Sequence, residues 1–167
     1  MTIVIERATS DDASKILNYL KSVGSETDNL TFGAEGLPIT VEAEAKYIDT
    51  IYNSCDDIML LAKENGRIVG CASLSRFPRR MNHRGDFSIS VLKEYWNRGI
   101  GNRLLCEILA LAKQYSFEVI ELQVRSDNLS AIHLYEKYGF IKIGTHPAFF
   151  KIGNDEIPFD YMVLKIK

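Results

Sequence analysis

A glycine-containing turn in the middle of the chain has the residue types of an anion-binding site. Residues 91–102 read VLKEYWNRGIGN, with an apolar strand-like run before Arg98, Gly99 and Gly101 and a helical pattern after them. Glycine has no Cβ atom, so a ligand can approach this backbone closely. The first N–H groups of a helix lack internal acceptors and lie at the positive end of the helix dipole. The turn is therefore expected to bind phosphate, although a glycine turn that only begins a helix would look the same.

A second segment, residues 128–140, reads NLSAIHLYEKYGF. Asn128 follows a strand-like run and can cap a helix, in which Ala131, Leu134 and Tyr138 face the sheet. Tyr135 comes seven residues after Asn128, so two helical turns place both residues on one face. Taken alone, Tyr135 is equally well explained as an amphipathic core tyrosine.

Together the two segments resemble the acetyl-CoA motifs of the GNAT superfamily of N-acetyltransferases. The glycine turn is similar to the family pattern (Gln/Arg)-x-x-Gly-x-(Gly/Ala), here residues 96–101. The second segment is similar to Asn-x-x-Ala-x-x-Leu-Tyr-x-Lys-x-Gly-Phe, the more specific of the two patterns. The turn lacks the residues that a P-loop or a dinucleotide-binding fingerprint needs. The exclusion of these two motifs agrees with the resemblance.

The resemblance implies a role for each matching residue. The strand end should separate from its neighbour and pair its backbone with the pantetheine arm through Ile89, Ser90 and Val91. Backbone amides around the turn should hold the pyrophosphate, namely those of Asn97, Arg98, Gly99, Ile100, Gly101 and Asn102. Asn128 should contact the pantetheine directly or through water. Tyr135 should stand beside the thioester sulfur and protonate the leaving thiolate, a task that suits a phenol of ordinary pKa about 10.

Two positions depart from the family patterns. Trp96 stands where the glycine pattern has Gln or Arg. Gln123 stands five residues before the motif asparagine, where ribosomal-protein alanine acetyltransferases carry a glutamate base. Glutamine cannot accept a proton, so Gln123 argues against that mechanism and that substrate. Asp86, in the strand leading to Val91, is the candidate base, with Glu121 on the adjacent strand as the alternative; a surface carboxylate is the other interpretation of Asp86.

Two loops are candidates for selecting the acceptor. Residues 25–38 contain Glu26 and Asp28, which could attract an amine. Residues 76–84 form a basic loop that contains Arg76, Arg79, Arg80, His83 and Arg84. That cluster could bind an anionic substrate group, the 3′-phosphate of the cofactor or RNA, but a solvated hairpin is the favoured interpretation.

The elements that must position these residues follow from periodicity and turn signals. We expect strands at residues 3–7, 58–63, 68–74, 87–92, 119–124, 140–143, 148–152 and 159–166. We expect helices from a Ser10 cap to residue 23, and over residues 40–53, 99–115 and 128–138. In the second helix, capped by Thr40, the inner face should hold Ala43, Ile48, Ile51 and Tyr52. This order predicts an α+β fold: a mixed, largely antiparallel six- or seven-stranded sheet with a splayed central strand pair and about four flanking helices.

Composition narrows the class of protein. The 167 residues fit one domain spanning residues 1–167, with 46% hydrophobic and 25% charged residues. The net charge of −2 gives no global attraction to nucleic acid or to an anionic membrane. No apolar run is long enough to span a membrane, and the first residues lack the pattern of a secretory signal. Cys55, Cys71 and Cys106 have neither metal-ligand nor disulfide spacing, so we expect no metal site and a reducing cytoplasmic location.

These observations predict an acetyl-CoA-dependent N-acetyltransferase that acts by direct attack of a primary amine in a ternary complex. The expected acceptor is a small-molecule amine. The alternatives are a ribosomal-protein or other peptide N-terminal acetyltransferase, and a non-catalytic acyl-CoA-binding regulatory protein. Many family members dimerise, and residues 159–166 form an apolar run that needs a covered edge, so a homodimer is also expected.

Overall fold

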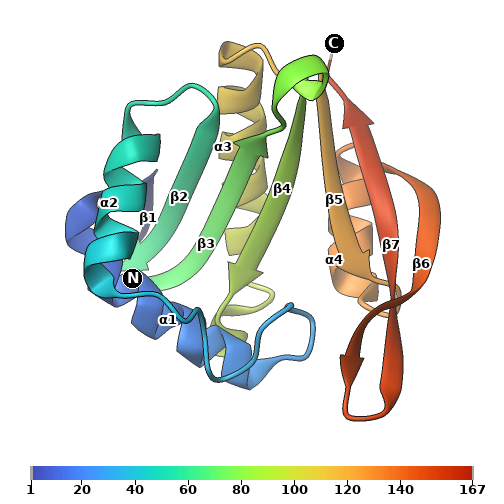
Figure 1. Cartoon of the computed structure of the whole chain (residues 1–167), viewed down its shortest axis with the longest axis horizontal. Coiled ribbons are helices and arrows are strands. Elements are labelled where there is room, and N and C mark those ends of the chain that lie inside the picture. Colours follow the sequence, from blue (N-terminus) through green and yellow to red (C-terminus); the bar gives the residue numbers. More distant parts are fainter. Residues whose placement is uncertain (1, 167) are drawn as a thin grey trace.

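A single mixed sheet of seven strands forms the centre of the computed structural model, which describes residues 2–166 (Figure 1). The strand order is β1-β2-β3-β4-β5-β7-β6, and every neighbouring pair is antiparallel except β4 and β5. The strands are β1 (Ile3–Arg7), β2 (Asp57–Glu64), β3 (Arg67–Arg76), β4 (Arg84–Val91), β5 (Val119–Arg125), β6 (Ile141–Ile152) and β7 (Asp155–Lys165). The expected α+β fold with a largely antiparallel sheet is confirmed.

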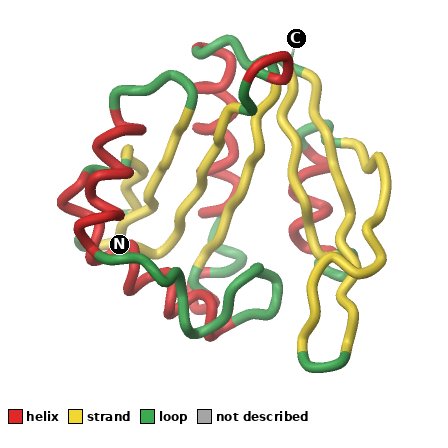
Figure 2. Tube along the Cα trace, viewed as in Figure 1, coloured by secondary structure: helices red, strands yellow, loops and turns green. Residues whose placement is uncertain are grey.

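Four helices cover the sheet: α1 (Ala13–Glu26), α2 (Val41–Tyr52), α3 (Ile100–Gln114) and α4 (Leu129–Lys137). Helices α1 and α2 lie on one face, and α3 and α4 lie on the other (Figures 1 and 2). Three short 3-10 turns, at Ser10–Asp12, Arg79–Met81 and Lys93–Tyr95, complete the elements. None of the helices between residues 2 and 166 has the length and apolarity needed to cross a bilayer.

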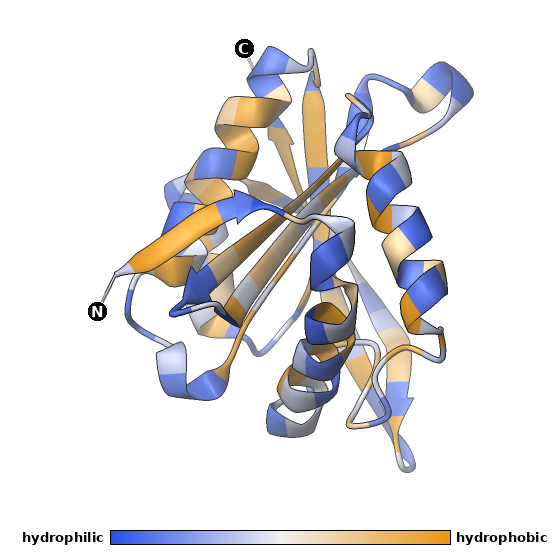
Figure 3. Ribbon diagram, turned by 90° about the vertical axis from the view of Figure 1, so that its left-hand side faces the viewer, coloured by the Kyte–Doolittle hydropathy of each residue, from blue (hydrophilic) through white to orange (hydrophobic). Residues whose placement is uncertain are grey.

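The two faces of the sheet differ in polarity because side chains alternate along each strand. The α3–α4 face carries buried apolar side chains, namely Ala72, Leu74, Phe87, Ile120 and Leu122. Figure 3 shows hydrophobic stretches along the strands and on parts of the helices that cover them. The α1–α2 face of the central strands carries polar side chains instead: Ser73, Ser75, Asp86 and Gln123. Each large apolar side chain buried in the core contributes roughly 1.5–3 kcal/mol to stability.

The first helical region begins differently from the prediction. Thr9, not Ser10, stands at its cap, where its backbone N–H donates to the Asp12 carboxylate at 3.1 Å. Lys63 Nζ donates to the same carboxylate at 2.6 Å. Burial raises the pKa of Asp12, but the hydrogen bonds from Lys63 and Thr9 outweigh it and the pKa lies below its usual value. Lys63 lies on β2, far from the cap in sequence, so the local sequence could not reveal this contact.

The second helix confirms the Thr40 cap, whose Oγ1 accepts a hydrogen bond from the Ala43 N–H at 3.2 Å. Its inner face differs from the prediction. Tyr52 is 45% exposed and Ala43 is also exposed, whereas Glu44 is buried beside Ile48 and Ile51. An apolar pattern could not identify a carboxylate as part of the inward stripe.

The C-terminal hairpin also differs from the prediction. Both predicted runs, from residue 141 onward, belong to one strand, β6, and β7 begins four residues before Phe159. Because β7 pairs with β5 on one side and β6 on the other, its apolar run already has both edges covered. The free edge is β6, where Ile141 and Ile143 are each 64% exposed. The homodimer stays a prediction, but the reason given for it from the sequence was wrong.

Candidate active site

The central feature of the candidate site is the separation of β4 from β5. Their parallel pairing is limited to three positions and ends at Asp86 opposite Glu121, although β4 continues to Val91 and β5 to Arg125. The two strands therefore diverge toward their carboxyl ends, as Figure 1 shows. Beyond Asp86, β5 offers no partner to the backbone of β4, including Ile89 and Ser90. This is the open strand edge that an extended ligand can join.

Trp96 fixes the end of this strand. Its indole Nε1 donates a hydrogen bond to the Val91 carbonyl at 2.7 Å, although the side chain is 41% exposed. The residue that departs from the family pattern therefore has a structural use, which is to hold the strand end in place. Ile89, Ser90 and Val91 are the strand residues predicted to pair with pantetheine. Among them, only Val91 has a carbonyl that accepts a hydrogen bond from the Trp96 side chain. Ser90 points its hydroxyl to the α1–α2 face, where Tyr19 lies 2.9 Å away.

The glycine turn opens α3 with an unusual backbone. Asn97 and Gly99 have φ angles of 60° and 76°, in the left-handed region that favours asparagine and glycine. Helix hydrogen bonding begins with the Arg103 N–H donating to the Gly99 carbonyl at 3.0 Å. The amides of Ile100, Gly101 and Asn102 therefore precede the first helical hydrogen bond and are directed out of the helix end.

Gly101 differs from Gly99 because its backbone does not require glycine. A Cβ added at Gly101 would meet the Leu134 side chain at 3.5 Å and the Ile89 side chain at 3.8 Å, which are ordinary contacts. Neither φ nor packing excludes a small side chain here. The missing side chain therefore leaves space between α3, α4 and the open end of β4.

Arg98 adds a positive charge at the turn. Its guanidinium lies 4.8 Å from the centre of the Tyr95 ring, whose hydroxyl donates to Glu64 at 2.6 Å. Within residues 2–166, no carboxylate forms an ion pair with Arg98. Asn102 has a different task for its side chain, which accepts hydrogen bonds from Lys137 and Tyr138 and joins α3 to α4. Arg98 thus supplies positive charge. Asn102 supplies a backbone amide at the turn, and its side chain links α3 to α4.

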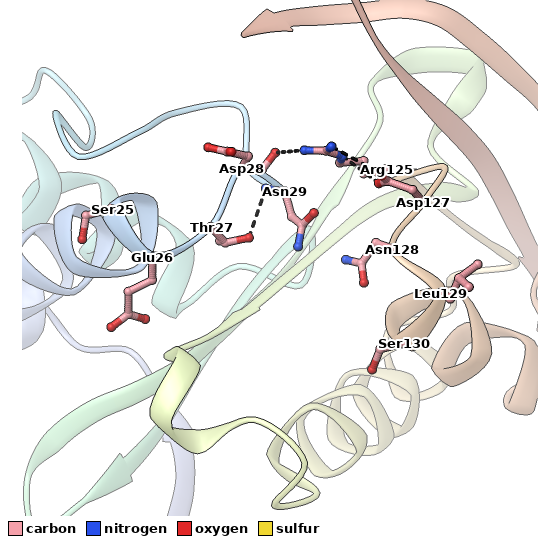
Figure 4. A pocket seen from close by; sticks show the side chains of 10 residues that line it. All are labelled: Ser25, Glu26, Thr27, Asp28, Asn29, Arg125, Asp127, Asn128, Leu129 and Ser130. Carbon is pink, nitrogen blue, oxygen red and sulfur yellow. Dashed lines mark hydrogen bonds and ion pairs between the residues drawn. The ribbon is translucent and has the colours of Figure 1, made fainter.

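A cleft of about 630 Å³ lies at the mouth of the separated strands. One wall is the end of α1 and the loop after it, and the other is the start of α4 (Figure 4): Ser25, Glu26, Thr27, Asp28, Asn29, Arg125, Asp127, Asn128, Leu129 and Ser130. The side chains of Asn29 and Asn128 face each other across it. Asn128 Oδ1 caps α4 by accepting from the Ala131 N–H at 3.3 Å. The predicted contact residue Asn128 therefore lines the cleft with its amide group.

Contacts that the sequence did not predict tie the two walls of the cleft together. Arg125 donates to the Asp28 carbonyl at 3.4 Å and pairs with Asp127 at 2.7 Å. Glu26 was expected to attract an amine, but its carboxylate accepts a hydrogen bond from the Lys93 N–H at 2.7 Å. It connects the end of α1 to the turn after β4. The Arg125–Asp28 and Lys93–Glu26 contacts join residues that are 97 and 67 positions apart, so only the folded structure reveals them.

Tyr135 lies on the α3–α4 face and is only 6% exposed. Its ring makes an edge contact with Phe87, at 6.2 Å between centroids, and a tilted contact with Phe140, at 5.7 Å. Phe87 is the first β4 residue beyond the pairing with β5, so Tyr135 stands where the strands separate. Burial raises the pKa of the Tyr135 phenol above its usual value. The hydroxyl is therefore protonated at neutral pH and has no protein acceptor among residues 2–166.

Asp86 lies at the same point on the opposite, α1–α2 face. Gln123 Nε2 donates a hydrogen bond to Asp86 Oδ1 at 3.3 Å. Burial raises the pKa of the Asp86 carboxyl; the Gln123 hydrogen bond opposes this effect, and the nearby Glu121 charge adds to it. Glu121 itself is held by Arg84 at 2.6 Å. Of the two candidate bases, Asp86 is the one whose carboxylate is not neutralised by an arginine.

The basic loop has mainly structural arginines. Arg76 pairs with Asp56 at 2.8 Å, donates to the Tyr115 carbonyl at 2.6 Å and lies 3.8 Å over the Phe117 ring. Arg84 pairs with Glu121, as described above. Arg79 and Arg80 lie on an exposed turn, and the His83 carbonyl accepts the N–H groups of residues 118 and 119. The loop precedes β4 and the glycine turn follows it, roughly 23 Å away for eight strand residues, which argues against the 3′-phosphate alternative.

Replacing Arg76 with alanine is expected to lower the free energy of unfolding by about 2–3 kcal/mol, because a partly buried ion pair, a backbone hydrogen bond and a cation–π contact are lost together. For a domain of this size, that corresponds to roughly 5–10 °C in melting temperature. Thermal unfolding followed by circular dichroism would measure it. Arg80→Ala is the control and should leave the melting temperature unchanged; a similar loss in both variants would contradict the structural assignment of Arg76.

Three comparisons with known proteins agree with this geometry. The sequence profile described as "Acetyltransferase (GNAT) family" matches residues 29–140. The N-alpha-acetyltransferase RimI of Mycobacterium tuberculosis is 36% identical over 94 residues, which cover 56% of this chain and 58% of that protein. The L-amino acid N-acetyltransferase AaaT of Escherichia coli is 33% identical over 111 residues, which cover 65% of this chain and 67% of that protein. The matched region thus spans somewhat more than half the length of these curated relatives.

Among solved structures, the acetyltransferase of the GNAT family from Streptococcus pneumoniae superimposes with a TM-score of 0.95 at 30% identity, covering 99% of this chain and 100% of that chain. The structure of yncA from Salmonella typhimurium with acetyl-CoA has the same fold, with a TM-score of 0.85 at 17% identity over 100% of this chain and 95% of that chain.

Proposed function

The chain belongs to the GNAT family of acetyltransferases, and from that premise we propose that it transfers the acetyl group of acetyl-CoA to a primary amine by direct attack in a ternary complex. The observation that carries this proposal is the placement of Asp86 and Tyr135. They lie on opposite faces of the sheet at the point where β4 and β5 separate. A base on one side and an acid on the other would assist both proton transfers of acyl transfer to an amine.

The residues around the separated strands fit acetyl-CoA. The open edge of β4 at Ile89, Ser90 and Val91 would pair with the amide-containing pantetheine arm. The helix-end amides of residues 97–102, with the charge of Arg98, would hold the pyrophosphate. Gly101 leaves the clearance between the two, and Asn128 would contact the arm from the other wall of the cleft. When bound, acetyl-CoA supplies an activated acyl carbon as a thioester.

Asp86 would accept the proton of the attacking amine, directly or through one water molecule. An alkylammonium has an ordinary pKa of about 10 and must lose a proton before its nitrogen can attack. Burial raises the pKa of Asp86, which makes its carboxylate a stronger base than a surface aspartate. Gln123 would position this carboxylate rather than act as a base itself.

Tyr135 would hold the proton that the departing sulfur needs. Its raised pKa keeps the phenol protonated, and the aromatic contacts with Phe87 and Phe140 hold the ring at one orientation. General acid–base groups of this kind contribute about a hundredfold to ten-thousandfold to rate. Positioning of the two reactants in one cleft would supply much of the remaining acceleration.

We propose a small-molecule amine as the acceptor. Gln123 replaces the glutamate base expected of a ribosomal-protein alanine acetyltransferase, and Asp86 takes a base position on the neighbouring strand instead. The relatives named above include both an N-alpha-acetyltransferase and an L-amino acid N-acetyltransferase. The second candidate, a peptide N-terminal acetyltransferase, rests on the first of these names.

A thiol-release assay with acetyl-CoA tests this proposal. Small aliphatic amines and short peptides with free N-termini should be offered to the wild-type protein in parallel. Thiol release with small amines at rates well above those with peptides is the expected result. Faster release with the peptides would favour the second candidate. Tight acetyl-CoA binding without thiol release for any acceptor would replace the enzyme with a non-catalytic acyl-CoA-binding protein.

A further inference from the structure

We propose that the acceptor is an arylalkylamine, a primary amine joined by a short carbon chain to an aromatic ring, and that Phe149 and Tyr161 of the C-terminal hairpin bind the ring. This inference rests on the proposed function and specifies its substrate class. It starts from a group of aromatic side chains on the same face of the sheet as Asp86.

The register of β5 and β7 places two aromatic residues near the candidate base. Tyr161 is paired with Gln123 across the two strands. Phe159, two residues earlier on β7, is paired with Arg125. Directly paired residues project to the same face, with Cβ atoms roughly 4.5–5.5 Å apart. Gln123 donates its side-chain hydrogen bond to Asp86 at 3.3 Å. Tyr161 is therefore a direct neighbour of the side chain that holds the candidate base.

Phe149 on β6 joins these two rings into one surface. Its ring stacks on Phe159, with the centroids 4.5 Å apart and the ring planes inclined by 23°. It also makes an edge contact with the Tyr161 ring, at 6.3 Å between centroids. Phe159 is only 3% exposed, whereas Phe149 and Tyr161 are half-buried. Phe149, Phe159 and Tyr161 thus form an aromatic wall, in which the two half-buried rings keep surface that a ligand can contact.

An irregularity in the hairpin puts Phe149 into the aromatic wall. The β6–β7 register shifts between His146 and Phe150, so that residues 147–149 lie opposite Pro158 alone. Because side chains alternate along a strand, Phe149 would point to the opposite face from His146 if the strand were regular. Instead the two rings are in contact, with centroids 5.9 Å apart. Bulges re-aim side chains in this way and are frequent next to active sites.

The aromatic wall is continuous with the cleft between α1 and α4. Arg125, the partner of Phe159, lines that cleft and donates to the Asp28 carbonyl on its other side at 3.4 Å (Figure 4). The next residue on the same face of β5 is Gln123, which holds Asp86. The wall therefore borders the path along the sheet from the cleft to the candidate base.

The charges along this path favour an amine without an anionic group. The cleft is lined by the carboxylates of Glu26, Asp28 and Asp127 and by the guanidinium of Arg125. Both oxygens of Asp127 accept hydrogen bonds from that guanidinium, at 2.7 and 3.1 Å. A carboxylate on the acceptor would have to displace this pair, whereas an ammonium group would meet opposite charge.

An aromatic ring on the acceptor would match the wall better than an aliphatic group of the same size. Offset-stacked and edge-to-face ring pairs are stabilised beyond the area that they bury. Tyr161 lies about one cross-strand spacing, roughly 5 Å, from Gln123. A spacer of two carbons would therefore let the amine reach Asp86 while the ring contacts the wall.

Steady-state kinetics of thiol release with matched acceptors test the proposal. The acceptors are 2-phenylethylamine, 2-cyclohexylethylamine and ethylamine, which differ only in the group beyond the same two carbons. The wild-type kcat/KM for 2-phenylethylamine should exceed that for ethylamine about tenfold to a hundredfold and that for 2-cyclohexylethylamine about threefold to tenfold. Phe149→Leu, which keeps an apolar side chain without a ring, should make the values for 2-phenylethylamine and 2-cyclohexylethylamine equal. Ile141→Leu, at the other end of β6, should retain the difference.

Equal wild-type kcat/KM values for 2-phenylethylamine and ethylamine would overturn the inference and leave the transfer of acetyl groups to amines intact. A value for 2-cyclohexylethylamine that equals or exceeds that for 2-phenylethylamine would overturn the aromatic assignment. So would a ring preference that survives in Phe149→Leu with a melting temperature close to that of the wild type. The wild-type comparison decides the matter even if this variant does not fold.

Calorimetry with CoA-loaded wild-type protein separates this failure from that of the proposed function. If none of the amines releases thiol from acetyl-CoA, binding of 2-phenylethylamine that ethylamine does not show would keep the aromatic wall as a ligand site and overturn the transfer reaction. Absence of binding for both amines would then overturn both proposals.

Discussion

Replacement of Tyr135 with phenylalanine is expected to lower kcat about a hundredfold to a thousandfold, with acetyl-CoA affinity within about twofold of the wild type. The substitution removes only the hydroxyl, while the ring contacts with Phe87 and Phe140 remain. The hydroxyl makes no hydrogen bond to other groups of residues 2–166, so its loss leaves no buried partner unsatisfied. The melting temperature should therefore be unchanged. A thiol-release assay measures kcat, and calorimetry with acetyl-CoA measures the affinity.

Tyr115→Phe is the matched control for this experiment. Tyr115 lies near the end of α3, where its hydroxyl accepts a hydrogen bond from Arg7 at 3.1 Å. The loss of this contact should lower stability slightly and leave kcat within about twofold. A Tyr135→Phe variant with wild-type kcat would remove Tyr135 from the mechanism and return it to the role of a core tyrosine.

Replacement of Asp86 with asparagine should lower kcat/KM at neutral pH about a hundredfold to a thousandfold. In the wild type, activity should be lost as pH falls through the pKa of Asp86, because only the carboxylate accepts a proton. Burial raises that pKa, so this acidic limb should lie above the range of an ordinary aspartate. In Asp86→Asn the limb should disappear from the pH–rate profile.

The stability of the same variant is expected to move in the opposite direction. An acid whose pKa is raised by folding stabilises the fold below its unfolded pKa and loses that contribution as pH rises through the folded pKa. At neutral pH the ionised Asp86 therefore weakens the fold, and Asp86→Asn should melt at or above the wild-type temperature. Asp49→Asn, on the exposed side of α2, is the control for both measurements. An acidic limb that persists in Asp86→Asn would assign the base to another group, with Glu121 the first to examine.

The parts of the site that the sequence predicted are those carried by local patterns. The glycine turn at residues 97–101 depends on a left-handed backbone at Gly99, and the start of α4 depends on the Asn128 cap. Both signals lie within a few residues of the structure they determine. The strand separation after Asp86 followed from the family resemblance, and the register of β4 with β5 confirms it.

Features that depend on distant segments were outside the reach of local patterns. Arg76 looked like part of a solvated basic loop, but its partners at Asp56, Tyr115 and Phe117 are far from it in sequence. The cleft walls at Asn29 and Arg125 meet only in the folded chain. Glu44 was missed for another reason, since a glutamate in an amphipathic helix is normally assigned to the outer face.

The C-terminal hairpin shows how irregularities can join two predicted strands into one. The strands predicted at residues 140–143 and 148–152 are separated by a short segment that contains Gly144 and Pro147. The register between β6 and β7 shifts after Lys142 and again after His146, so irregularities absorb these residues inside one strand. Glycine and proline are tolerated at such positions, above all on an edge strand.

Calorimetry with acetyl-CoA on the wild type and on Gly101→Trp tests the central claim most directly. A Cβ at Gly101 makes ordinary contacts with Leu134 and Ile89, so Gly101→Ala is a folded control that should retain binding. The tryptophan side chain would instead fill the space between the glycine turn and the open edge of β4. The structure predicts saturable binding of one acetyl-CoA per wild-type chain and its loss in Gly101→Trp at an unchanged melting temperature. Absence of binding to the wild type, or equal affinity in the tryptophan variant, would contradict an acetyl-CoA site at this turn.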